Sequence, residues 1–232
     1  MEVNFSNITT IGFDADDTLW VNETYFREAE HHFARLLSAF ETENTIDQEL
    51  FKTEIANLDL YGFGIKSFTL SMVESAIQLS NGKISSEIIT EILNIGKEMI
   101  AKPVELLDGI EEVLQILSPK YRLLLLTKGD LLDQERKLEK SGLSKYFHHV
   151  EVLSDKKESN YANLLEHLEI PVHNFLMVGN SLKSDVLPLV NIGAKAIHVP
   201  FHTTWAHELV HGHENNGEYL HVESIKEVLK YL

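Results

Sequence analysis

The sequence predicts an α/β protein in which a doubly wound parallel sheet is interrupted by a helical insert near the N-terminus. After residue 103, short apolar segments alternate with segments of helical periodicity, which is typical of a parallel sheet covered by helices on both faces. Between residues 20 and 102 only helical periodicity is present. We therefore expect a core domain formed by residues 1–19 and 103–232, and a helical domain formed by residues 20–102.

The elements can be assigned in order along the chain. The first strand is expected at residues 8–13, an apolar run that ends at Asp14. In the insert, apolar residues between Phe26 and Phe40 recur at helical spacing, and residues 85–100 repeat the pattern after Ser85 or Ser86, either of which is a suitable cap. The later elements are expected as helix 109–117, strand 121–126, helix 131–141, strand 149–153, helix 158–168, strand 174–178, helix 183–191, strands 194–199 and 219–222, and helix 225–232.

The composition disfavours several classes of function. The 232 residues include 36 acidic and 20 basic side chains, for a net charge of −16, and such a surface repels nucleic acid phosphates. No apolar run approaches the roughly 18 residues needed to span a bilayer. The chain has no cysteine, and its first ten residues lack the features of a signal peptide. We expect a cytoplasmic protein without nucleic-acid or membrane partners; protein partners are left open.

Polar side chains follow four of the predicted strands. Because parallel strands joined by right-handed crossovers end at one edge of a sheet, these side chains are expected to meet where ligands bind. Neighbouring carboxylates repel each other unless a cation neutralises them or one of them holds a proton, and oxygen atoms are the ligands that Mg²⁺ prefers. Each residue alone has an ordinary structural explanation, so their joint placement carries the prediction. The set is Asp14, Asp16, Thr127, Lys156 with Lys157, Asn180 and Asp185.

Four segments resemble the signatures of the haloacid dehalogenase superfamily. Residues 14–18 (DADDT) resemble the first signature, and Thr127 at the end of an apolar strand resembles the second. Lys156, five residues before Tyr161, resembles the third, and residues 178–185 (VGNSLKSD) resemble the fourth. The resemblance implies a Rossmann-like core, with a helical cap in the insert that follows the first signature.

The resemblance also implies a role for each residue. Asp14 would be the nucleophile that forms a phosphoaspartate, and Asp16 would protonate the leaving group and then activate water. The phosphate-binding residues would be Thr127, Lys128 and Lys156, and Mg²⁺ would be held by Asp14, Asp16 through its backbone carbonyl, Asp185 and, as a further candidate, Asn180. Many relatives carry Asp at the position of Asn180, and Lys157 is an alternative to Lys156.

These roles predict a magnesium-dependent phosphatase for a small phosphorylated metabolite. Asp16 favours phosphoryl transfer because the dehalogenase branch lacks an acid at this position. A phosphomutase of the same family is the alternative, and the substrate and oligomeric state stay open. In the insert, a glycine-flanked aromatic loop suggests Tyr61, Phe63 and Lys66 as substrate contacts; the alternative is that Tyr61 and Phe63 pack inside the insert.

A competing motif lies near the C-terminus. Residues 207–211 (HELVH) match the zinc-protease signature, in which two histidines one helical turn apart bind the metal and a glutamate is the base. Against this, Gly212 interrupts the required helix, the 21 residues after His211 leave little room for a third ligand, although His213 and Glu223 exist, and the strand-end residues are unexplained. A polar helix is the simpler expectation. A non-catalytic binding module is also disfavoured, because both a nucleophile and an acid are present.

Overall fold

The computed structural model describes residues 4–232 and divides them into two compact units. The α/β unit contains residues 4–23, 104–128 and 136–232, and the helical unit contains residues 24–103 and 129–135. The sequence analysis expects an insert of residues 20–102. In the structure, the helical unit consists of residues 24–103 together with residues 129–135, which follow the second strand.

The α/β unit is built on a six-stranded sheet whose neighbouring strands are all parallel. The strand order is β3-β2-β1-β4-β5-β6, so the order reverses between β1 and β4. This confirms the predicted doubly wound sheet, and such a reversal is where ligands usually bind. The strands are β1 (Thr10–Phe13), β2 (Arg122–Lys128), β3 (His149–Leu153), β4 (Phe175–Gly179), β5 (Lys195–His198) and β6 (Leu220–His221).

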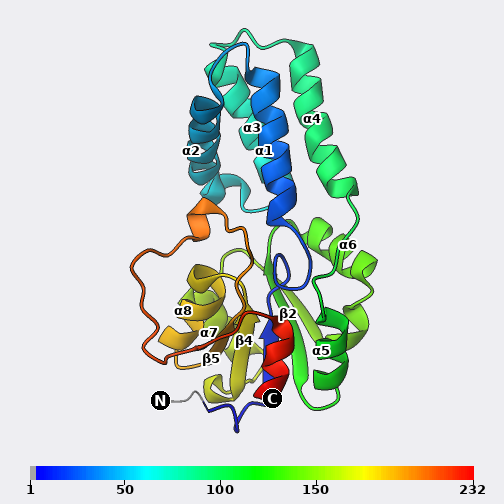
Figure 1. Cartoon of the computed structure of the whole chain (residues 1–232), viewed down its shortest axis with the longest axis vertical. Helices are drawn as coiled ribbons and strands as arrows, with labels where there is room; N and C mark the ends of the chain where they lie inside the picture. Colours follow the sequence, from blue (N-terminus) through cyan, green and yellow to red (C-terminus); the bar gives the residue numbers. More distant parts are fainter. Residues whose placement is uncertain (1–3) are drawn as a thin grey trace. The chain divides into compact units, whose positions relative to one another are not determined.

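Side chains that alternate along the strands create two apolar faces. In β2, Leu123 and Leu125 belong to one buried cluster, whereas Leu124 and Leu126 belong to another. The first cluster receives side chains from the helices α5 (Ile110–Leu117) and α6 (Leu131–Ser141) and from the 3₁₀ segment η5 (Ile225–Lys230). The second cluster receives side chains from α7 (Glu158–His167) and α8 (Leu187–Asn191). Figure 1 shows α5 on one side of the strands and α7 with α8 on the other.

The helical unit packs around an apolar core of its own. Its four helices are α1 (Glu23–Leu37), α2 (Glu43–Tyr61), α3 (Ile65–Leu79) and α4 (Ser86–Ala101) (Figure 1). The residues that fill this core include Phe33, Leu37, Ile46, Leu50, Phe68, Met72 and Ile92. Of the two predicted caps of α4, the structure uses Ser85, whose side chain accepts a hydrogen bond from the backbone N–H of Ile88.

Three of the elements expected after residue 103 differ in the structure. The expected helix 183–191 starts as a π-helical turn, η3 (Leu182–Val186), before α8 begins. The closing helix is a 3₁₀ segment that ends at Lys230. Strand β2 continues through Thr127 and Lys128, because both residues still pair with β3. Within residues 4–232, no helix combines the length and the apolar character that a membrane crossing requires.

Short 3₁₀ turns connect several of the elements. They are η1 (Ser144–Tyr146) before β3, η2 (Val172–Asn174) before β4, and η4 (Ala206–Glu208) in the long segment between β5 and β6.

Candidate active site

Asp14 stands at the carboxyl end of β1, where the strand order reverses. Its backbone N–H donates to the carbonyl of Val178 in β4 (3.0 Å), which extends the pairing of the two strands by one residue. The Asp14 side chain is buried, and its Oδ2 accepts a hydrogen bond from the Thr18 hydroxyl (2.8 Å). The same hydroxyl accepts the backbone N–H of Asn180 (3.0 Å). Thr18 therefore joins the loop after β1 to the loop after β4.

One ammonium group joins two of the predicted carboxylates. Lys156 Nζ lies 2.5 Å from Asp14 Oδ1 and 2.7 Å from Asp185 Oδ1, and only 1% of the lysine side chain is exposed. The three residues follow β1, β3 and β4, so the fold brings together residues that are far apart in the sequence. The adjacent Lys157 is 70% exposed and pairs with Asp155. The structure thus directs Lys156, and not Lys157, to the carboxylates.

The burial of this group shifts the pKa values of its members. Burial raises the pKa of Asp14 from 3.8 to about 7; the charge of Asp185 adds to this increase, while Lys156 opposes it. Burial alone would lower the pKa of Lys156, but Asp14 and Asp185 raise it well above 10.5. One ammonium thus faces two carboxylates, and a second cation is needed to balance the charge when both are ionised.

The turn after β4 is shaped to hold Asp185 against the end of the strand. The backbone N–H of Ser181 donates to Asp185 Oδ2 (3.0 Å), and the carboxylate crosses directly over Gly179. A Cβ atom at Gly179 would lie 2.4 Å from Asp185 Oδ2, so only glycine leaves room for this approach. The π-helical turn η3 carries Asp185, and such turns often occur at functional sites.

The oxygen atoms around Asn180 fit a divalent cation. One end of its side-chain amide lies 3.2 Å from Asp14 Oδ2, 3.2 Å from Thr18 Oγ1 and 3.3 Å from the carbonyl oxygen of Asp16. With nitrogen at this end, the amide donates to all three oxygens. With oxygen at this end, the amide accepts a hydrogen bond from the Thr18 hydroxyl (3.2 Å), and its oxygen also faces the Asp14 and Asp16 oxygens, an arrangement that a cation between them would favour.

Carboxylate, carbonyl and amide oxygens are together the donors that suit Mg²⁺. Among residues 4–232, no three His, Asp or Glu side chains converge in the manner of a metal site. A cation here would therefore depend on the Asp16 carbonyl and the Asn180 amide in addition to the carboxylates of Asp14 and Asp185. The donor set fits a hard cation and does not fit a zinc site built from side chains.

Asp16 is held by two donors that the sequence analysis did not identify. Its Oδ1 accepts hydrogen bonds from Trp20 Nε1 (2.7 Å) and from Lys137 Nζ (2.8 Å). Lys137 comes from α6 and also donates to Asn22 Oδ1 (2.8 Å). A tryptophan four residues after Asp16 was a visible signal, whereas nothing in the pattern around Lys137 indicated a contact with the loop after β1.

Comparison with known proteins identifies the family. The profile of haloacid dehalogenase-like hydrolases matches residues 8–193. The chain belongs to this family. It is therefore an enzyme of the hydrolase class, as the sequence analysis predicts from its four signatures.

Individual members of the family are similar over nearly the whole chain. The N-acylneuraminate-9-phosphatase of Mus musculus is 26% identical over 205 residues, which cover 84% of this chain and 83% of that protein; the Homo sapiens enzyme has the same identity and coverage. A haloacid dehalogenase-like family hydrolase from Xanthomonas campestris has a solved structure with a TM-score of 0.82 and 36% identity, over 95% of this chain and 92% of that chain. The resemblance thus extends to the helical unit.

In this haloacid dehalogenase-like hydrolase, the two predicted phosphate ligands of β2 differ in their surroundings. The Thr127 side chain is buried at the strand end, and its hydroxyl donates to the carbonyl of Lys128 (3.2 Å). Lys128 Nζ donates to Ser184 Oγ (2.9 Å) and to Glu208 Oε1 (2.7 Å). Lys128 is thus bound to a carboxylate of the protein, and any contact with phosphate would have to compete with Glu208.

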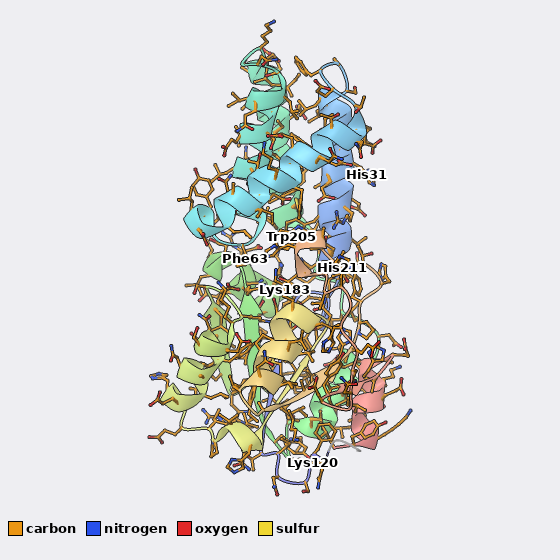
Figure 2. All side chains as sticks on the ribbon, turned by 90° about the vertical axis from the view of Figure 1, so that its left-hand side faces the viewer. His31, Phe63, Lys120, Lys183, Trp205 and His211 are labelled. Atoms are coloured by element: carbon orange, nitrogen blue, oxygen red, sulfur yellow. The ribbon has the colours of Figure 1, made fainter. Side chains whose placement is uncertain are left out.

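The residues of the zinc-protease motif have another role in this hydrolase. His207 and Glu208 lie in η4, and residues 209–211 are not helical, so the two histidines do not share a helical face. His207 Nε2 lies 3.1 Å from Lys183 Nζ, a neighbour unsuited to a metal ligand. The expected polar helix is therefore wrong, and the zinc-protease alternative has no geometric basis. Figure 2 shows Trp205 and His211 on this segment, with Lys183 nearby.

Glu208 attaches the segment between β5 and β6 to the turn that carries Asp185. Besides Lys128, its carboxylate accepts hydrogen bonds from Ser181 Oγ (2.5 Å) and Ser184 Oγ (2.6 Å). Burial would raise the pKa of Glu208, but Lys128 and the hydroxyl donors outweigh burial and lower the pKa from 4.5 to about 2. The ionised carboxylate is thus strongly preferred in the folded state.

We expect Glu208→Gln to destabilise the protein in a pH-dependent manner. Because the folded-state pKa lies below the unfolded value, the stabilisation is complete above about pH 4.5 and disappears as the pH falls towards about 2. A shift of this size corresponds to about 3 kcal/mol at neutral pH. Urea denaturation of both proteins across this pH range measures the difference. A loss that does not vary with pH would contradict the assignment, and Glu111→Gln, which removes an exposed partner of Lys145, is the control.

The three predicted substrate contacts of the insert lie around the turn between α2 and α3. Tyr61 is the last residue of α2 and is 51% exposed, so the alternative that it packs inside the insert is wrong. Phe63 lies in the turn itself, and Lys66, in the first turn of α3, donates to Asp130 Oδ1 (2.8 Å). Their contact with a substrate stays a prediction.

Proposed function

We propose that this hydrolase is a magnesium-dependent phosphatase that transfers the phosphoryl group of a small metabolite to Asp14 and then to water. The observation that carries the proposal is the buried Asp14 carboxylate at the reversal of the strand order, held by Lys156 and Thr18, with Asp16 two residues further along the chain. A carboxylate that attacks a phosphate meets charge repulsion, so cationic neighbours are the main requirement for the reaction.

The chain's own side chains account for each step. The Asp14 carboxylate attacks phosphorus, the bond to the leaving-group oxygen breaks, and protonated Asp16 supplies the proton that this oxygen needs. In the second step, the Asp16 carboxylate takes a proton from water as the water oxygen attacks phosphorus, which releases inorganic phosphate and restores Asp14. Lys156 and Thr127 hold the phosphoryl oxygens.

Magnesium would be held by Asp14, the Asp16 carbonyl, Asp185 and Asn180. When bound, it supplies positive charge that reduces the repulsion between the nucleophile and the phosphate. The raised pKa of Asp14, about 7, gives an independent reason for a metal, because close to half of this carboxyl group is protonated at neutral pH without one. A cation beside Asp14 favours the ionised form that attacks phosphorus.

The helical unit would serve as the cap that excludes water and contacts the leaving group. The exposed Tyr61, together with Phe63 and Lys66, would contribute to these contacts.

The similar enzymes from Mus musculus and Homo sapiens are named as phosphatases of N-acylneuraminate 9-phosphate, which makes this sugar acid phosphate the first substrate to test.

We expect release of inorganic phosphate to require Mg²⁺. The experiment measures phosphate release from N-acylneuraminate 9-phosphate and from a panel of sugar, glycolate and nucleoside monophosphates, with Mg²⁺ and with EDTA. Activity should disappear with the chelator and return when excess Mg²⁺ is added. Activity that the chelator does not change would contradict the metal requirement. Isomerised sugar phosphate without phosphate release would show a phosphomutase instead.

A further inference from the structure

We propose that Lys137 and Trp20 are positioning residues that orient the Asp16 carboxyl group for proton transfer to the leaving group. This inference rests on the proposed phosphatase function and extends it to residues outside the four signatures. Both donors contact the same oxygen of Asp16, at 2.7 Å from Trp20 Nε1 and 2.8 Å from Lys137 Nζ. Because both N–H donors converge on one oxygen, they restrict rotation of the Asp16 carboxyl group.

The direction of the Trp20 N–H is set by the fold. The Trp20 side chain is fully buried, with 1% of the residue exposed, and belongs to the apolar core of the α/β unit. Its backbone is fixed as well, because its carbonyl accepts the N–H of Asp17 (2.8 Å) and its backbone pairs with that of Leu106. An indole held in this way cannot follow Asp16 if the carboxyl group rotates, so rotation breaks the hydrogen bond.

Lys137, which lies in α6, restrains Asp16 through a second hydrogen bond. Its ammonium is held between Asp16 Oδ1 and Asn22 Oδ1, both at 2.8 Å, and 16% of the lysine side chain is exposed. The backbone N–H of Asn22 in turn donates to Asp17 Oδ1 (2.8 Å). The lysine is thus anchored to two side chains of the loop that carries the acid, unlike a mobile surface lysine. A charge-assisted hydrogen bond of this kind is short and directional.

A defect in the position of the acid has a distinctive kinetic signature. An alkyl phosphate releases an alkoxide, which needs a proton as the bond breaks, whereas p-nitrophenyl phosphate releases a stable phenolate that needs little help. The ratio kcat/KM reports the steps up to release of the alcohol and excludes the later hydrolysis of the phosphoaspartate. A mispositioned acid therefore lowers kcat/KM for the alkyl substrate selectively.

The experiment compares kcat/KM for the best alkyl phosphate of the panel with that for p-nitrophenyl phosphate. Lys137→Met is expected to lower the first value roughly 10- to 100-fold, part of the contribution of a general acid, and the second less than about threefold. Trp20→Phe, which keeps the ring but removes the N–H donor, should show the same selectivity. Lys137→Arg retains a cation with N–H donors, so its values should lie between those of the wild type and Lys137→Met.

The controls separate a positioning role from a structural one. Thermal unfolding of each variant shows whether it is folded, and Lys145→Met, which removes an exposed lysine paired with Glu111, should leave both kinetic values unchanged. Equal losses on both substrates, or no loss on either, would overturn the proposal. If the wild type hydrolyses neither substrate with Mg²⁺ present, the proposed function itself is wrong and the role of Lys137 is excluded with it.

Discussion

Asp14→Asn is expected to abolish phosphate release while leaving the protein folded. The amide is nearly the same size as the carboxylate but cannot attack phosphorus, so kcat should fall at least ~10⁴-fold, the scale seen when an enzyme loses its nucleophile. Removing the ionisable group should not destabilise the protein at neutral pH, because the folded state disfavours the ionised form of Asp14. Activity and stability are therefore expected to change independently.

The sign of the stability effect follows from the pKa of Asp14. Since the folded-state value of about 7 is above the usual 3.8, the folded state holds its proton more tightly, and the wild type without metal loses stability as the pH rises from about 4 to 7. Asp14→Asn lacks this loss, so in EDTA it should be at least as stable as the wild type at about pH 8. Urea denaturation tests this expectation.

Two further measurements test the nucleophile directly. Mass spectrometry after a rapid acid quench should find the phosphoryl group on the peptide that contains Asp14 in the wild type and on no peptide of the variant. Asp108→Asn, at an exposed carboxylate that pairs with Lys226, is the matched control and should keep full activity. An Asp14→Asn protein within about tenfold of wild-type kcat would rule out Asp14 as the nucleophile.

Lys156→Met is expected to be the most destabilising substitution in the site. The methionine fills much of the same volume but leaves the buried carboxylates of Asp14 and Asp185 without the ammonium that lies between them. Removing one partner of a buried ion pair costs about 3–5 kcal/mol. Lys157→Met removes the adjacent exposed lysine and should cost no more than about 0.5 kcal/mol. Similar losses for the two variants would contradict the assigned roles.

The destabilisation should depend on pH and on magnesium. Without Lys156, the main opposition to the effects of burial and of Asp185 on the Asp14 pKa is lost, so the folded state takes up protons even more readily. The loss should therefore be smallest at about pH 5 and grow as the pH rises. Mg²⁺ should recover part of the lost stability, because it returns positive charge to the carboxylates. An unfolding free energy that responds to neither would show that Lys156 acts through packing alone.

Much of the site could be predicted because its residues directly follow apolar strands. Asp14 comes after the buried β1, Thr127 is the last residue but one of β2, and Asn180 comes after β4; a buried strand is a continuous apolar run, so its approximate end is visible in the sequence. The topology of a doubly wound sheet then brings these ends to one edge. The same reasoning favoured Lys156 on its spacing from Tyr161 but left Lys157 open, since either lysine lies just before the start of α7.

Glu208 and Lys137 show where such reasoning stops. Glu208 was noticed only as part of an apparent zinc motif, because the identity of its partners depends on how the segment between β5 and β6 folds back to Lys128 and Ser184. Lys137 was not noticed, because its contact with Asp16 joins residues 121 positions apart. Neither contact produces a periodic pattern or a short motif from which it could be predicted.

By itself, the sequence determined the order of strands and helices, the family, and the acidic residues at the strand ends, because these depend on local apolar periodicity and on short motifs. The tertiary structure decided between the favoured Lys156 and its alternative Lys157, and it alone decided which donors hold Asp16 and what Glu208 binds. Those outcomes depend on burial: an ammonium or a carboxylate removed from water must find a partner of opposite charge or a hydrogen-bonding group, and only the packed fold determines which partner is within reach.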